Sequence, residues 1–366
     1  MGMGFTCGIV GLPNVGKSTI FNALSSAHVP ASSYPFCTID CNKAMVAVPD
    51  KRLHTIAAMI KPPAVTPTVI EFVDIAGLVK GASRGEGLGN QFLGHIRAVD
   101  AVAHVVRCFK KQDVSHLYGG LDPKRDMDIV ATELIMADLQ TVEKRAEKAA
   151  KQVRIGEKKA EEEMMVYGKA RSCLEEGKAV RSMEWKEEEH ILLKDLSLLT
   201  AKPLLYVANV DEEELRGKGL SAIVERRAQQ EKAGFVVICG DLEAEIALLE
   251  REEERKEFMA DMGLEVSGLE HLVQVGYSML DLITFYTTVG TELRAWTLAR
   301  GIRAPQAAGK IHSTMEHGFI KAEVVSYADF VKAGSLAAAR EEGHLRLEGK
   351  DYIIADGDIV YFKFST

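Results

Sequence analysis

Residues 11–18 read GLPNVGKS, and this stretch matches the phosphate-binding pattern G-x-x-x-x-G-K-S at every fixed position. An apolar run over 7–10 precedes it and predicts a buried strand, while a helical pattern over 19–24 follows it. The glycines let the backbone curl so that successive N–H groups point at phosphate oxygens, and the helix start adds partial positive charge. Because strand, loop and helix occur in this order, the sequence predicts that the chain binds a nucleoside triphosphate.

The same loop carries the side chains that such a site needs. We expect Lys17 to reach the β- and γ-phosphates and to assist catalysis, and we expect the Ser18 hydroxyl to ligate Mg²⁺. The residues expected to contact the nucleotide here are Asn14, Val15, Gly16, Lys17, Ser18 and Thr19.

A second motif follows at residues 72–77, which read FVDIAG and place Asp74 at the end of a predicted strand. In hydrolases with this loop, such an aspartate holds Mg²⁺ through a water, and the N–H of the glycine, here Gly77, contacts the γ-phosphate. Leu78 stands where many small GTPases have a glutamine that orients the attacking water. Leucine makes no side-chain hydrogen bond, so the water is positioned from elsewhere or hydrolysis is intrinsically slow.

Switch segments are expected on both sides of this strand. Thr38, in the sequence PFCT over 35–38, is the predicted switch hydroxyl that reaches Mg²⁺, with Thr19 and Ser33 as alternatives. The glycine-rich stretch 78–90 suits a segment that the γ-phosphate orders and that loosens after hydrolysis.

The expected base-recognition motif departs from that of GTPases, which read guanine with N-K-x-D after a strand. Here residues 209–212 read NVDE, so Val210 replaces the lysine and Glu212 replaces the aspartate. A polar site that no longer fits its hydrogen-bonding partner loses discrimination, so strict guanine specificity should be absent. A shift of register would let Asp211 supply the carboxylate, which leaves some GTP binding open. The loop expected to cap the base is also degenerate, and Asp241 adds negative charge there.

The bulk composition is that of a soluble globular protein. The chain has 366 residues, of which 47% are hydrophobic and 27% charged, and this length suggests two or three domains. No apolar stretch approaches the roughly 18 residues that cross a membrane. The six cysteines form no disulfide framework, so we expect a cytoplasmic protein with no membrane partner. A net charge of −8 argues against non-specific DNA binding, although it is compatible with a local basic face.

The chain divides into regions with three different sequence patterns. Residues 1–127 and 201–280 alternate strand-like and helix-like segments, as in a doubly wound α/β domain that binds the nucleotide. Residues 128–200 lack proline and are rich in Glu, Lys and Ala, which predicts an inserted antiparallel helical pair. The charged residues of this helical pair either form a solvated surface or belong to a protruding arm that contacts a polyanionic partner. Residues 281–366 predict a small α+β domain, with strands expected over 292–298, 318–325, 352–354 and 359–364.

Taken together these motifs resemble the YchF family, the Obg-like ATPases, over essentially the whole chain. The resemblance rests on the phosphate loop and on five further stretches: YPFCTI at 34–39, DIAGLVKGA at 74–82, GEGLGN at 85–90, VVRCF at 105–109 and APQAAGKIH at 304–312. The last stretch lies far in sequence from the nucleotide motifs, which makes chance agreement improbable.

The resemblance implies an α/β fold: a P-loop NTPase G-domain with an inserted α-helical coiled coil and a C-terminal TGS domain of the β-grasp type. It implies an ATPase that also accepts GTP, depends on Mg²⁺, is stimulated by K⁺ and associates with ribosomes. Asn14 matches the asparagine linked to the monovalent ion, and Asn209 with Glu212 matches the N-x-x-E base motif. His116 corresponds to the family's proposed catalytic histidine.

The leading hypothesis is therefore Mg²⁺-dependent hydrolysis of ATP by a ribosome-associated nucleotide switch. One alternative is a non-catalytic adaptor that senses ATP, and another is a GTP-preferring GTPase associated with translation. A metabolic kinase is the weakest, because switch-like loops favour water as the acceptor. No feature demands more than one copy, so we expect a monomer.

Overall fold

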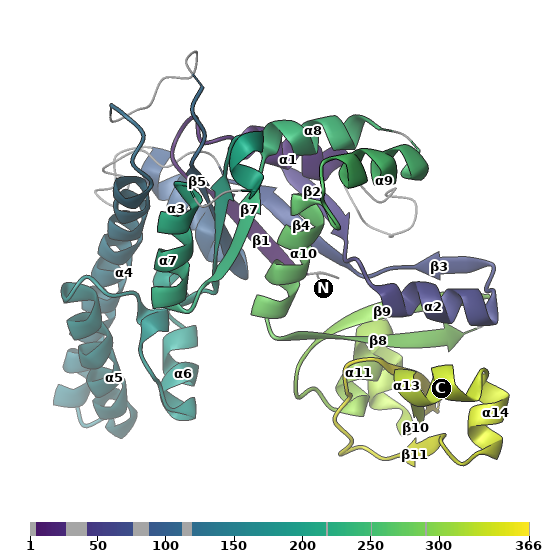
Figure 1. Ribbon diagram of the computed structural model, residues 1–366. Coiled ribbons are helices and arrows are strands. Elements are labelled where there is room, and N and C mark those ends of the chain that lie inside the picture. The colour runs from purple at the N-terminus through teal and green to yellow at the C-terminus, as the bar shows by residue number, and fades with distance from the viewer. Residues whose placement is uncertain are drawn as a thin grey trace.

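The computed structural model describes residues 5–26, 42–75, 88–111, 119–216, 219–249, 251–289 and 291–365. Within these residues the chain forms two six-stranded sheets with helices around each (Figure 1). Three predicted site residues, Thr38, Gly77 and His116, lie outside the described residues.

The first sheet has the order β2-β4-β1-β5-β6-β7, and every strand is parallel to its neighbours except β2, which runs antiparallel to β4. Its strands are β1 (Phe5–Val10), β2 (Lys43–Ala47), β4 (Val69–Asp74), β5 (Ala101–Arg107), β6 (Leu204–Asn209) and β7 (Gly234–Ile238). Both β5 and β6 are buried at every residue, as expected for strands covered by helices on both faces. The expected doubly wound sheet is thus present.

Helices cover both faces of this sheet (Figure 1). One face carries α1 (Lys17–Ser26), α8 (Gly240–Leu248), α9 (Glu252–Asp261) and α10 (Gly268–Met279), and the other carries α3 (Leu88–Ala98), the start of α4 (Pro123–Arg154) and α7 (Ser221–Glu231). Strand order reverses around β1, which lies between β4 and β5. In open α/β sheets, ligands bind at the carboxyl ends of the strands at such a switch point, and here the phosphate loop leaves β1.

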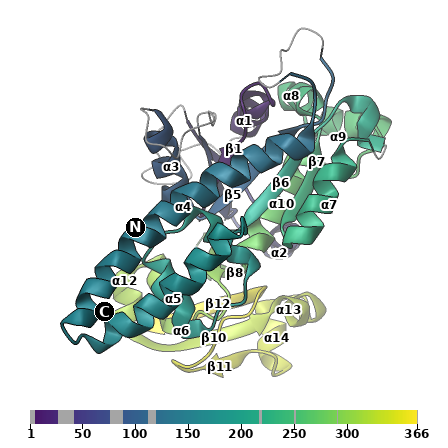
Figure 2. The same ribbon diagram turned by 90° about the vertical axis from the view of Figure 1, so that its left-hand side faces the viewer.

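A helical arm projects from the first sheet (Figure 2). Its long helices are α4 and α5 (Lys158–Glu175), joined by residues 155–157, and α6 (Glu187–Lys194) packs beside them. The helix that leads into this insertion begins before the expected boundary at residue 128, since α4 begins at Pro123 and the Asp122 side chain caps it by accepting from the Arg125 N–H. Proline at the first helical position and an aspartate cap are ordinary start signals.

The first turns of α4 belong to the core of the first sheet. Met127, Val130 and Leu134 are buried in that core, whereas Val142 and Ala149 further along are buried in a separate core with α5. The arm is therefore anchored by one continuous helix that spans two cores.

The second sheet has the order β11-β10-β12-β8-β9-β3. Most of it comes from the C-terminal part of the chain: β8 (Leu282–Val289), β9 (Glu292–Ala299), β10 (Phe319–Ser326), β11 (Arg346–Glu348) and β12 (Asp358–Phe364), with helices α11 (Ala304–Ile311), α12 (Ser313–His317), α13 (Tyr327–Ala333) and α14 (Leu336–Glu341). The strand expected over 352–354 is wrong, since this stretch makes a single β-bridge, between Ile353 and Arg303.

A segment from early in the chain completes the second sheet. After β2 the chain forms α2 (Lys51–Ile60) and β3 (Ala64–Thr66), and β3 pairs in parallel with β9. The Arg52 guanidinium donates to Asp356 at 2.8 Å, and Leu53 and Ile56 are buried with residues of the second sheet. The expected assignment of all of 1–127 to the first domain is thus corrected for 51–66, because the apolar face of α2 packs against the second sheet.

Within the part of the chain that the structure describes, no helix combines the length and apolar character needed to cross a membrane.

Candidate functional site

The phosphate loop has a backbone that glycine makes possible. Gly16 has a φ of 93°, and a Cβ there would lie 2.1 Å from the Asn209 Nδ2 atom. Gly11 has a φ of 154°, and its Cβ would lie 2.5 Å from the Val105 carbonyl oxygen. Both glycines therefore allow the loop to pack directly against neighbouring strand ends, which no larger residue would permit.

Lys17 lies inside the loop rather than in solvent. Its ammonium donates to the carbonyl oxygens of Gly11 at 3.0 Å and Leu12 at 2.7 Å, and the residue is only 8% exposed. Burial lowers the pKa of Lys17 to about 8, and the negative charge of Asp74 opposes that shift. A phosphate placed here would favour the charged ammonium, so the loop holds a cation whose charge the ligand would stabilise.

Asp74 ends β4 next to β1 and offers an acceptor for a cation. Its Oδ1 atom is buried and has no hydrogen-bond partner among the described residues. The pKa of its carboxyl is raised, because the effect of burial exceeds the opposing effect of the Lys17 charge. A buried carboxylate oxygen without a partner is unfavourable unless a cation or donor meets it. Oxygen ligands of this kind, together with the Ser18 hydroxyl, are what Mg²⁺ prefers, so the residues present fit that ion.

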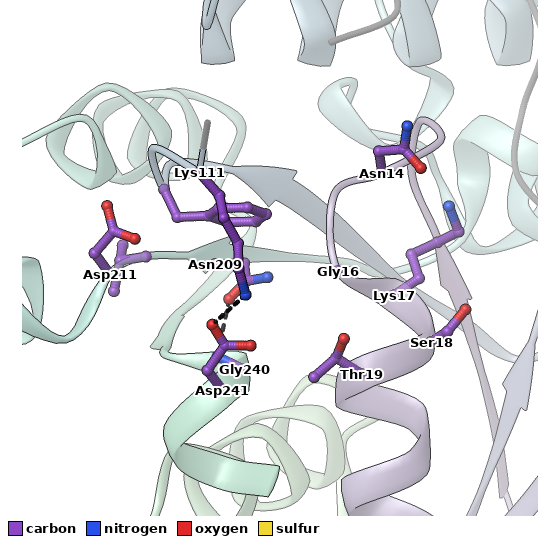
Figure 3. Close-up of a pocket in the computed structure, with 12 residues that line it drawn as sticks. Asn14, Gly16, Lys17, Ser18, Thr19, Lys111, Asn209, Asp211, Gly240 and Asp241 are labelled. Carbon is purple, nitrogen blue, oxygen red and sulfur yellow. Dashed lines mark hydrogen bonds and ion pairs between the residues drawn. The ribbon is translucent and has the colours of Figure 1, made fainter. Parts of the chain in front are cut away.

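These groups open into a pocket of about 280 Å³ at the carboxyl ends of β1, β5, β6 and β7. Figure 3 shows Lys17, Ser18 and Thr19 on one side and Lys111, Asp211 and Asp241 on the other. The residues that line it are Asn14, Gly16, Lys17, Ser18, Thr19, Phe109, Lys111, Asn209, Val210, Asp211, Gly240 and Asp241. We call the first five of these the phosphate end and the other seven the base end. Val15 is buried beside the pocket, and its carbonyl faces Asn209.

Asn209 joins the two ends. Its side chain is buried, with Nδ2 donating to the Val15 carbonyl at 2.9 Å and Oδ1 accepting from the Gly240 N–H at 3.0 Å. One amide therefore fixes the phosphate loop, the end of β6 and the start of α8 relative to one another.

The base end differs from the arrangement expected from the sequence. Val210 is 2% exposed, and Asp211 lines the pocket while its Oδ2 accepts from the Lys110 N–H at 2.9 Å. Glu212, the expected base-reading carboxylate, is exposed at the start of a 3₁₀ helix and is not among the residues that line the pocket. Within residues 209–212, the carboxylate at the pocket wall is therefore that of Asp211.

Sequence reasoning did not identify Phe109 and Lys111 as part of the site. Phe109 lines the pocket with the Arg107 guanidinium stacked 4.5 Å from its ring centroid. The Lys111 ammonium lies 3.1 Å from the Asp241 carboxylate, on the side of the pocket opposite Lys17 (Figure 3). The feature that could have identified them is their position in the chain, since both residues follow β5 at the same sheet edge as the phosphate loop.

Comparison with known proteins agrees with this architecture. Residues 6–158 match the family described as "50S ribosome-binding GTPase", and residues 282–365 match the YchF-GTPase_C family, described as a protein of unknown function. The chain is 47% identical to the "Ribosome-binding ATPase YchF" of Bacillus subtilis over 367 residues, covering 100% of both chains. It is also 47% identical to the protein of the same name from Escherichia coli O157:H7, again over 100% of both chains.

Solved structures give the same result. The Schizosaccharomyces pombe YchF GTPase superposes with a TM-score of 0.90 at 35% identity, covering 99% of this chain and 98% of that one. A GTP-binding protein from Pyrococcus horikoshii, at 18% identity and a TM-score of 0.62, shares the fold. The predicted fold class, an α/β P-loop domain with a C-terminal domain, is confirmed. With full-length identity at this level, the chain belongs to the YchF family.

Proposed function

We propose that the protein hydrolyses ATP to ADP and phosphate with Mg²⁺, accepts GTP with less specificity, and acts as a ribosome-associated nucleotide switch. The observation that carries the proposal is the combination of a phosphate loop that keeps the general pattern with a base end in which valine replaces the lysine of the N-K-x-D motif. Lys17 and Ser18 line the phosphate end, and Asp74 lies close enough to Lys17 for their charges to interact. Buried Val210 occupies the position where GTPases have that lysine.

In this proposal the loop N–H groups and Lys17 bind the β- and γ-phosphates and hold the γ-phosphorus in place for attack. Ser18 and Asp74 would hold Mg²⁺, with Thr38 proposed as a further contributor from the sequence. The ion would neutralise charge on the transferred group. Water attacks the γ-phosphorus, the bond to the β–γ bridging oxygen breaks, and that oxygen leaves on ADP. The resemblance assigns the positioning of this water to His116, and the motif that begins at Asp74 assigns contact with the γ-phosphate to Gly77.

Base recognition is proposed to depend on shape and on two carboxylates. Phe109 offers an aromatic face and Val210 an apolar wall, while Asp211 and Asp241 offer acceptors for an amino group. One oxygen of Asp211 is already engaged by the Lys110 N–H, which leaves less for the paired donors of guanine. We therefore replace Glu212 with Asp211 as the carboxylate nearest the base.

The presence of Asp211 in the pocket wall also favours a second candidate, a GTP-preferring hydrolase. Its second oxygen remains available to guanine donors, and the related Schizosaccharomyces pombe protein is named a GTPase. The bacterial relatives carry the name of an ATPase, which is why ATP is the substrate proposed first.

Ribosome association comes from the relatives' names and from the arm. The curated relatives are named ribosome-binding, and α4 connects the core of the nucleotide domain to the projecting helices without a break. We propose that the arm and the second sheet face the ribosome, and that the protein works as a monomer in the cytoplasm.

The test is release of phosphate from ATP, with and without purified ribosomes, in Mg²⁺ and after chelation. The proposal expects slow release that needs Mg²⁺ and rises when ribosomes are added, and release from Lys17→Met that is slower by about a hundredfold or more. ATP binding without phosphate release under any condition would make the non-catalytic adaptor the correct function.

Two finer assignments have their own controls. Replacing K⁺ with Na⁺ should lower turnover of the wild type and leave the Asn14→Ala variant unchanged, since Asn14 is the proposed contact for the monovalent ion. His116→Ala should lower ribosome-stimulated turnover without changing ATP affinity. Unchanged turnover would remove His116 from the mechanism.

A further inference from the structure

A second cavity, of about 460 Å³, lies between the first sheet and α4 and shares no lining residue with the nucleotide pocket. Its floor is the sheet itself: Val10, His104 and Tyr206 are neighbours in register on β1, β5 and β6. Its roof is the first part of α4, which Figure 2 shows running across the sheet in front of β5. Residues 177–182 and the last turn of α7 form the remaining wall.

His104 is the first sign that this cavity is a binding site. The residue is 3% exposed and lines the cavity. The ring lies beside the Tyr206 ring, at a centroid distance of 5.5 Å. Burial lowers the pKa of His104 to about 3, so the neutral ring offers one donor and one acceptor. A neutral imidazole that lines a cavity can therefore form a hydrogen bond with a ligand there, either as donor or as acceptor.

The polar wall is the second sign, and it is built around Glu231. Its carboxylate accepts from Arg181 at 2.9 Å, from the Tyr206 hydroxyl at 3.1 Å and from Arg227. Burial alone would raise the pKa of Glu231, but Arg181 and Arg227 outweigh it and the pKa is lowered. The carboxylate is therefore fully engaged as an anion, while the buried Nε of Arg181 has no partner in the described part of the chain.

The charges that line the cavity are unequal. Lys178, Arg181 and Arg227 line it on the cationic side, against Glu231 alone on the anionic side. The further partners of two of these cations, Glu176 and Asp128, do not line the cavity and have side chains 61% and 47% exposed. At one end of the cavity, a ligand would thus meet more cationic hydrogen-bond donors than anionic acceptors.

Apart from Ser182, Thr200 and Gln230, the rest of the lining has no polar side chain. Val102 and Leu204 extend the floor, and Val130, Leu134 and Ile135 of α4 form the roof. Cavities of this size with mostly apolar walls and a few convergent polar groups are typical of sites for small organic ligands.

We propose that this cavity binds a small organic carboxylate with an apolar body. The apolar body lies between the sheet and α4, the carboxylate meets Arg181, and His104 supplies a further hydrogen bond. Because Val10 directly precedes Gly11 of the phosphate loop, the ligand occupies a place where the arm, the sheet and the nucleotide site meet.

The test uses the full chain and three probes of one length: octanoate, octanol and octylamine. Calorimetry should show saturable binding of octanoate, with octanol and octylamine weaker by about tenfold or more, because a charge-assisted hydrogen bond is lost. In spectra of protein with ¹⁵N-labelled histidine, octanoate should shift the signal that disappears in His104→Gln.

Two variants locate the binding. Ala131→Phe fills the cavity from α4 without removing a charge and should weaken octanoate binding at least about tenfold. Met136→Phe, on the same helix but outside the cavity, is the matched control and should bind as the wild type does. Arg181→Met should weaken octanoate without weakening octanol, while Arg227 and Tyr206 still satisfy Glu231.

Three results would overturn the proposal. They are octylamine binding as tightly as octanoate, octanoate binding that survives both Ala131→Phe and Arg181→Met, and no saturable octanoate binding in the millimolar range.

Discussion

The two ends of the nucleotide pocket follow different rules. At the phosphate end, Gly16 and Lys17 keep the spacing of the general pattern, and contacts are made by backbone groups and one buried cation. At the base end, Phe109 follows β5, Asp211 follows β6 and Asp241 lies in the first turn of α8. Both carboxylates are already paired with groups of the protein.

This difference indicates that the base end, and not the phosphate end, sets the specificity for the nucleotide base. Triphosphates present the same oxygens whatever the base, so backbone amides in a fixed loop suffice for them. Discrimination between bases depends on side chains that satisfy or leave unpaired the donors and acceptors of each base. Substitutions at each end, and at Asn209 between them, should therefore have different effects.

The largest effect is expected at the phosphate end. Lys17→Met removes the cation that binds the β- and γ-phosphates, and phosphate release should fall by about a hundredfold or more for ATP and GTP alike. Comparing single-turnover rates of the two nucleotides measures it. A loss confined to one nucleotide would contradict the division between the two ends.

The next effect tests the link. Asn209→Ala deletes both hydrogen bonds and leaves the Gly240 N–H and the Val15 carbonyl without partners, so unfolding free energy should fall by about 2 kcal/mol. Asn209→Asp keeps the acceptor for Gly240 and should cost less. Denaturant titrations of both variants measure this, with ATP affinity determined alongside. An Asn209→Ala variant as stable as the wild type would contradict the account.

The charge of Lys17 predicts a pH dependence. Burial lowers the pKa of Lys17 to about 8 in the protein without nucleotide, and bound phosphate favours the charged form. Binding therefore takes up a proton above that pKa, so ATP affinity should be level below about pH 8 and fall as pH rises further, by up to about tenfold per unit. Lys17→Met should bind weakly and lack this slope in calorimetric titrations.

The smallest effects belong to the base end. Lys111 and Asp241 have side chains 54% and 71% exposed, so Asp241→Ala should leave stability unchanged and shift the ratio of ATP to GTP affinity by less than about tenfold. Glu212→Ala is the matched control outside the pocket and should leave that ratio unchanged. A larger effect from Glu212 than from Asp241 would restore Glu212 as the base-reading residue.

The sequence signals for the phosphate end are local. The glycine spacing, Lys17, Ser18 and the strand that ends at Asp74 are each read within a few residues. The start of α4 was equally local, since Asp122 and Pro123 are ordinary start signals, and it was missed because the charged pattern further along dominated the interpretation.

Other features depend on contacts between distant segments. The three-residue strand β3 pairs with β9, and Arg52 meets Asp356, across more than half of the chain. No local pattern marks such pairing. Phe109 and Lys111 similarly join the site through the position of β5 in the sheet, which becomes visible only once strand order is known.

The central claim is that the base end does not select guanine. Calorimetric titration of the wild-type protein with ATP and with GTP, side by side in Mg²⁺, tests it directly. The account predicts that ATP binds at least as tightly as GTP. GTP binding tighter by about a hundredfold would contradict it, because discrimination of that size requires a site built to pair with guanine.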